Sequence, residues 1–192
     1  MSKGYRLRAI LSVLAVGVAS LALAASAGAK DGGGVVIQSR DACDPATFPP
    51  GLCARTDNSG GVVTFQELLD AVGSPKHAHP AWRFTKDDLT VKRGTPVTAE
   101  FGRGGEVHSF TDVTATGFGP GCIGLLNGLM FGKEDTSPLC GTVDPGGAGL
   151  GAILATSGLF PGRPLAIDTS TPGTRLFQCM IHPWMRTTVT VE

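Results

Sequence analysis

Beyond one hydrophobic run near the N-terminus, the sequence has no long hydrophobic stretch, and it lacks a basic cluster and regular helical patterns. After residues 10–23 no apolar stretch reaches the roughly 20 residues of a membrane span, so we expect none in the mature chain. Lysine plus arginine equals aspartate plus glutamate at 16 each, and no patch of basic residues suggests nucleic acid as a partner. Because helical patterns are rare while 28 glycines and 13 prolines are present, the sequence predicts a mainly β fold with many turns.

The N-terminal residues have the three parts of a secretory signal. Lys3, Arg6 and Arg8 precede the apolar run, and residues 27–29 are small enough for a cleavage site. We therefore predict a signal peptide over residues 1–29 and an exported protein, either periplasmic or secreted. A retained N-terminal anchor is the alternative.

The rest of the chain divides into an extension and a β domain. Residues 30–80 combine a strand at 35–37, a loop at 40–61 and a helix at 64–72, where Thr64 and Glu67 match a capping box. Residues 81–192 form the main domain, with strands expected near 89–91, 97–101, 107–113, 175–179 and 185–192. Residues 114–165 are rich in glycine, and we expect an insertion there with short strands or turns.

Five cysteines are an odd number for an exported chain. The simplest of three connectivities pairs Cys43 with Cys53 and Cys122 with Cys140, which staples the loop and the insertion. Cys179 is then left over, and a free thiol in an oxidising compartment needs a role. Coordination of a metal is one such role.

A compact group of metal-ligating residue types surrounds this cysteine. Cys179, His182 and Met185 fall within seven residues between two predicted strands, and strand alternation places Met185 on the buried face. His108, on another strand, supplies a second imidazole. Two histidines, a thiolate and a thioether form the ligand class of blue-copper electron-transfer sites.

Other metals and chemistries fit these residues less well. Zinc could accept the thiolate and both imidazoles, but a Met185 ligand argues against it. A c-type haem needs Cys-x-x-Cys-His, which is absent, and a thiol nucleophile would need an orienting third residue that the sequence does not identify. The pair His77 and His79 suggests a solvated loop, with a weaker copper site or a docking feature as the alternative.

The segment Cys179-Met180-Ile181-His182-Pro183-Trp184-Met185-Arg186 resembles the copper loop of the cupredoxins, the plastocyanin- and azurin-like type 1 copper proteins. It is most similar to the short loop of amicyanin. The turn at 172–174 and the segment ending at His108 also resemble the family, although Ser109 stands where many members have asparagine. The resemblance implies a Greek-key β-sandwich with one mononuclear type 1 copper.

From these observations we expect an electron-transfer protein and no enzyme. Four protein ligands, His108, Cys179, His182 and Met185, would leave no open position for a substrate. We expect a monomer that exchanges single electrons with an unidentified redox partner protein, with His182 as the edge through which electrons leave. A copper carrier without redox cycling, and an interaction domain with an incidental metal, are the alternatives.

Overall fold

The computed structural model describes residues 33–54, 61–140 and 148–192, so the predicted signal peptide lies outside the described residues. In chain order, the elements are β1 (Val35–Arg40), α1 (Phe65–Gly73), β2 (Arg83–Phe84), β3 (Asp88–Val91), β4 (Val97–Arg103), β5 (His108–Ser109), β6 (Thr111–Asp112), α2 (Gly124–Phe131), a 3-10 turn (Pro138–Cys140), α3 (Ala148–Ser157), β7 (Gly158–Leu159), β8 (Leu165–Ile167), β9 (Gly173–Gln178) and β10 (Arg186–Val191).

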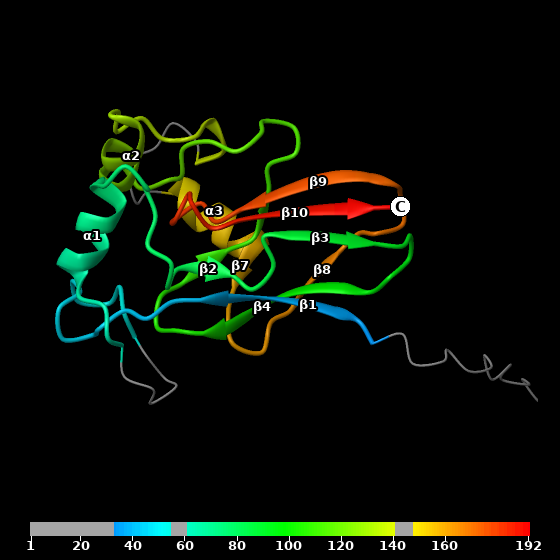
Figure 1. Cartoon of the computed structure of the whole chain (residues 1–192), viewed down its shortest axis with the longest axis horizontal. Helices are drawn as coiled ribbons and strands as arrows, with labels where there is room; N and C mark the ends of the chain where they lie inside the picture. Colours follow the sequence, from blue (N-terminus) through cyan, green and yellow to red (C-terminus); the bar gives the residue numbers. More distant parts are fainter. Residues whose placement is uncertain (1–32, 55–60, 141–147) are drawn as a thin grey trace, which may run out of the picture. The chain divides into compact units, whose positions relative to one another are not determined.

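Two four-stranded sheets carry the fold. One has the strand order β2-β1-β4-β8 and the other β3-β10-β9-β6, and Figure 1 shows β3, β10 and β9 lying side by side. Alternate residues of both sheets face a shared apolar core, for example Ile37 and Ala99 from the first sheet and Val189 from the second, all fully buried. The predicted mainly β sandwich is confirmed.

The strand predicted over 107–113 is interrupted. β5 pairs with β7 in a small separate sheet, whereas β6 pairs with β9 in the second sheet. Phe110, between them, is 4% exposed and stacks on Phe177 at 4.5 Å, so it belongs to the core. The interruption turns His108 and Ser109 toward the end of β9, where the loop containing Cys179 begins.

The helices differ from the sequence expectation in number. α1 follows its N-cap Thr64, as predicted, and the capping box with Glu67 is present. The insertion, however, forms α2 and α3 in addition to turns. The apolar residues of α2 and α3 are not confined to one helical face. The sequence therefore lacks the one-sided period that indicates an amphipathic helix.

Both predicted disulfides are confirmed. Cys43 is bonded to Cys53, and Cys122 to Cys140. Cys179 remains a free, buried cysteine. Within the described ranges, no helix is both long enough and apolar enough to cross a membrane.

Candidate metal centre

Cys179 follows the last residue of β9 and is 0% exposed. Two backbone hydrogen bonds fix its position. Its own N–H donates to the carbonyl of Met185 at 3.0 Å, and the N–H of Ser109 donates to its Sγ at 3.4 Å. The thiol is therefore held between the end of β9 and the short strand β5, pointing inward.

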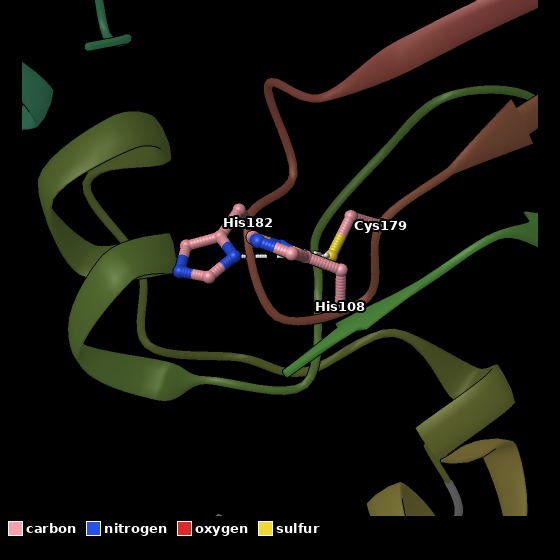
Figure 2. A group of neighbouring side chains, drawn as sticks. All are labelled: His108, Cys179 and His182. Carbon is pink, nitrogen blue, oxygen red and sulfur yellow. Dashed lines mark hydrogen bonds between the residues drawn. The ribbon is translucent and has the colours of Figure 1, made fainter. Parts of the chain in front are cut away.

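Two imidazoles face this sulfur with the same ring nitrogen. The Nδ1 atom of His108 lies 4.0 Å from Sγ, and that of His182 lies 3.8 Å from it (Figure 2). A metal ion bonded to sulfur at about 2.3 Å and to nitrogen at about 2.0 Å, in a trigonal arrangement, separates such atoms by about 3.7 Å. The three ligand atoms lie within 4.8 Å of one another and all three residues are buried, so the donor set fits one thiophilic ion.

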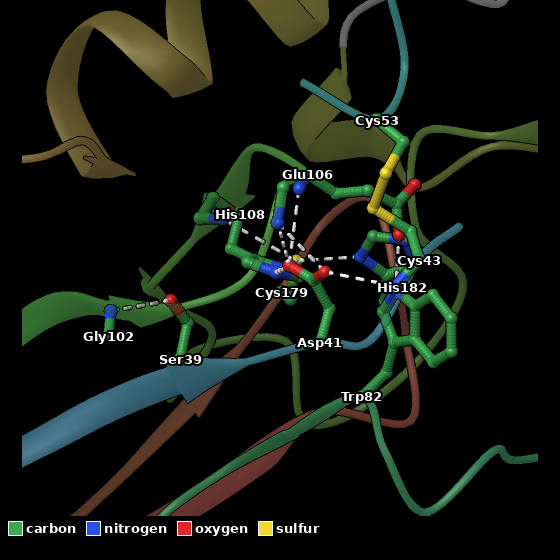
Figure 3. A network of polar contacts seen from close by, with 12 residues as sticks. Ser39, Asp41, Cys43, Cys53, Trp82, Gly102, Glu106, His108, Cys179 and His182 are labelled. Atoms are coloured by element: carbon green, nitrogen blue, oxygen red, sulfur yellow. Dashed lines mark hydrogen bonds and ion pairs between the residues drawn. A yellow bond between two sulfur atoms is a disulfide. The ribbon is translucent and has the colours of Figure 1, made fainter. Parts of the chain in front are cut away.

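Each imidazole has a carboxylate behind it. The Nε2 atom of His108 is 2.9 Å from Oδ2 of Asp41, and that of His182 is 3.5 Å from Oε2 of Glu106 (Figure 3). The indole N–H of Trp82 also donates to Glu106. A carboxylate that accepts the Nε2 proton leaves the Nδ1 lone pair free for a metal, so both contacts favour the tautomer that metal binding at Nδ1 needs.

These contacts shift the acid–base equilibria of the metal-free centre. Burial raises the pKa of the Cys179 thiol, but hydrogen bonds and positive charge from His108 and His182 outweigh burial and hold that pKa well below its usual range. Burial lowers the pKa of His182, but the carboxylate of Glu106 and the sulfur of Cys179 outweigh it and raise the pKa to about 10. In the metal-free centre these directions favour a thiolate beside a protonated imidazole, so a metal that binds there must displace protons.

Met185, the fourth ligand expected from the sequence, is 1% exposed and begins the return of the loop toward β10. Its backbone N–H donates to the carbonyl of His182 at 2.9 Å, and its carbonyl accepts from Cys179. Thr187, Val189 and Val191 are also buried, which agrees with the predicted inward face of the last strand. The assignment of Met185 as a metal ligand stays a prediction.

Ser109 ties the two parts of the centre together. Its hydroxyl accepts the backbone N–H of Met180 at 2.9 Å and the hydroxyl of Thr111 at 3.0 Å, while its own N–H donates to the sulfur. Ser109 therefore links β5 to the segment that contains Cys179 and Met180.

His182 does not form an exposed edge, contrary to the sequence expectation. It is 1% exposed, and its Nε2 atom faces Glu106. Apolar residues of α1, α2 and its own loop surround an adjoining cavity of about 140 Å³. Trp184 meets His182 edge-on at 5.3 Å and also lines a groove at the surface. Sequence patterns do not reveal this cover, because it comes from segments far away along the chain.

The histidine pair of the extension lies outside the centre. Nδ1 of His77 bonds the carbonyl of Val72, and Nδ1 of His79 accepts the N–H of Ala81. Among the described residues, neither belongs to a group of potential metal ligands.

Sequence reasoning missed Asp41, Trp82 and Glu106. Asp41 follows β1 in the extension and reaches the centre because β1 pairs with β4. Glu106 precedes His108 by two residues, which is the one local signal that could have drawn attention to it.

Comparisons with known proteins find only solved structures. No family model and no curated protein matches the chain. A purple cupredoxin from Nitrosopumilus maritimus is 14% identical, with 82% of this chain and 99% of that chain covered and a TM-score of 0.38. Plastocyanin from Dryopteris crassirhizoma is 21% identical, with 58% and 89% covered and a TM-score of 0.31. An amicyanin variant is 19% identical, with 55% and 70% covered and a TM-score of 0.30. These values do not set amicyanin apart from the other cupredoxins.

Proposed function

We propose that this chain is an exported, cupredoxin-like type 1 copper protein that transfers single electrons between redox partners. The observation that carries the proposal is the buried thiolate of Cys179 with the Nδ1 atoms of His108 and His182 at 4.0 and 3.8 Å. We include Met185 as the axial ligand, because it is buried and hydrogen-bonded to the loop that holds the other ligands. A copper ion bound there would exchange one electron between Cu(II) and Cu(I).

The residues of the chain prepare the site before any metal arrives. Asp41 and Glu106 orient the imidazoles, and the backbone N–H of Ser109 orients the sulfur. The ligands are 0–1% exposed, so water has little access and the protein holds them in one arrangement. A centre whose ligands move little between two charge states needs little reorganisation when an electron arrives or leaves, which suits electron transfer.

The visible spectrum after addition of Cu(II) tests this function. We expect an intense blue band from charge transfer between thiolate and copper, and Cys179→Ser should abolish it. The matched control is Met180→Leu, which changes the neighbouring sulfur-containing side chain without removing a predicted ligand. A colourless wild-type protein that holds one equivalent of Cu(II) would contradict the type 1 assignment.

Copper handling without redox cycling is the second candidate. It is favoured by one observation, the burial of both imidazoles, because a buried ligand edge gives a redox partner no direct contact with the centre. Reversible electrochemistry together with reduction by a soluble redox protein would support electron transfer. Tight binding of Cu(I) without reversible cycling would support a carrier.

A further inference from the structure

Glu106 lies in a dry, fixed position behind His182. Its side chain is 9% exposed, and its Oε2 atom accepts the indole N–H of Trp82 as well as facing Nε2 of His182 at 3.5 Å. Trp82 is itself 1% exposed and stacks on Phe48 at 6.1 Å, which fixes the donor. The carboxylate therefore has little freedom to turn away from the imidazole.

The charge of Glu106 is not offset by a permanent cation. Among the residues that the structure describes, no lysine or arginine is paired with it, and its side chain contacts Trp82 and His182. Buried charges are screened much less by solvent and salt than exposed ones. When the Nδ1 atom of His182 is bonded to a metal, the negative charge of Glu106 therefore acts on that metal through a single imidazole ring.

We propose that Glu106 sets the redox preference of the metal centre, by holding the Nδ1 atom of His182 toward Cys179 and by favouring the divalent over the monovalent copper ion. The physical reason is that a fixed negative charge attracts a dication about twice as strongly as a monocation at the same place. The inference rests on the proposed copper function and adds to it a reduction potential lowered by the carboxylate. Glu106 is a positioning residue, since it acts through His182.

Asp41 occupies the equivalent place behind His108 but is less suited to a clean test. Its carboxylate also accepts backbone N–H groups of Cys43, Gly105 and Glu106. A substitution at Asp41 would leave these buried donors without an acceptor and disturb the loop before β5. Within the described parts of the chain, the side chain of Glu106 makes no hydrogen bond to the backbone, so its charge can be changed with less structural damage.

The test compares copper-loaded wild type, Glu106→Gln, Glu106→Asp and the control Glu100→Gln. Glu100 lies on β4 and accepts a hydrogen bond from Thr98, so it provides the same chemical change elsewhere in the sandwich. The readouts are the reduction potential and, under anaerobic competition with chelators, the separate affinities for Cu(II) and Cu(I). We expect Glu106→Gln to raise the potential and to lower the ratio of Cu(II) to Cu(I) affinity on the order of tenfold to a hundredfold. Glu106→Asp and Glu100→Gln should keep the wild-type preference between Cu(II) and Cu(I).

An unchanged potential in a Glu106→Gln protein that still shows the blue band would overturn the inference, as would an equal loss of affinity for both ions.

A second measurement needs no variant: the ¹⁵N shifts of the His182 ring in Cu(I)-loaded wild type should show a protonated Nε2, and a deprotonated Nε2 would refute the positioning role. Failure of the proposed function is a separate result, because it would appear as the absence of the blue band from wild type itself.

Discussion

At the scale of single residues, Cys179 is the meeting point of three hydrogen-bonding paths. Its sulfur faces the imidazoles of His108 and His182 and accepts a backbone N–H from Ser109. Each of these groups is itself bonded further out, the imidazoles to carboxylates and the serine hydroxyl to the backbone of Met180. A side chain in such a network is confined in position, because moving it breaks bonds that buried groups cannot replace with water.

Ser109 offers a residue-scale prediction. Replacing it with alanine removes the hydroxyl that accepts the buried Met180 N–H, so an unsatisfied donor remains. We expect Ser109→Ala to lower the free energy of unfolding by about 1–3 kcal/mol in the metal-free protein. Urea-induced unfolding followed by circular dichroism measures this change.

The matched control is Thr174→Ala, which removes an exposed hydroxyl on β9. It should change the free energy of unfolding by no more than about 0.5 kcal/mol. If Ser109→Ala were as mild as this control, the hydroxyl would not be needed to secure the loop.

At the scale of elements, the loop between β9 and β10 is short and closed by its own backbone. Met185 donates to the carbonyl of His182 at 2.9 Å, and Arg186 donates through Nε to the carbonyl of Pro183 at 2.8 Å. The six residue pairs of the antiparallel β9–β10 ladder continue directly from this closure. The spacing of the ligands along the sequence therefore translates into a fixed spacing in space.

Helix α1 gives an element-scale prediction. Its N-terminus is satisfied by Thr64, whose side chain accepts the N–H of Glu67 at 3.2 Å while Glu67 accepts the N–H of Thr64 at 2.8 Å. We expect Thr64→Ala to lower the free energy of unfolding by about 1 kcal/mol. The variant loses the hydroxyl that accepts the Glu67 N–H and so disrupts the capping box. Thermal unfolding checks it.

Gln66→Ala, in the same helix and exposed, serves as the comparison. Alanine is a strong helix former, so this variant should be neutral or slightly more stable. A Thr64→Ala protein that unfolds at the temperature of Gln66→Ala would contradict the importance of the cap.

At the scale of the whole molecule, the two disulfide-bridged segments contact the surroundings of Cys179 from different parts of the chain. The segment containing the Cys43–Cys53 bridge supplies Asp41 and bonds to the loop before β5 through Ala54 and Gly105. The segment containing the Cys122–Cys140 bridge donates from the N–H of Cys122 to the carbonyl of Met180. The insertion therefore supports the metal centre directly.

Removal of the second bridge is the whole-molecule prediction. In the double variant Cys122→Ala/Cys140→Ala, we expect the free energy of unfolding to fall by about 2–4 kcal/mol, because the unfolded chain regains freedom that the bridge had removed. We also expect weaker copper binding, since the contact with Met180 loosens. Chemical unfolding and a copper titration measure the two effects. The control Leu139→Ala, 39% exposed beside the bridge, should change both quantities little.

The sequence predicted more about the centre than about its surroundings. Cys179, His182 and Met185 are close along the chain, so one loop pattern was enough to connect them, and strand alternation was enough to place Met185 inward. The helices of the insertion were not predicted, because their apolar residues lack a one-sided period. The break after Ser109 was not predicted either, since it depends on which strands β5 and β6 find as partners.

From the sequence by itself, local patterns predicted a mainly β fold and the group of metal-ligating residue types. The resemblance to the cupredoxins implied the sandwich, and the simplest of the possible pairings gave both disulfides. Only the tertiary structure decided that Asp41 and Glu106 lie behind the two imidazoles and that His182 is buried. Asp41 is 67 residues from His108 along the chain, and its approach follows from the parallel pairing of β1 with β4. Such contacts depend on the free energy of packing the whole chain, which no single segment of the sequence determines.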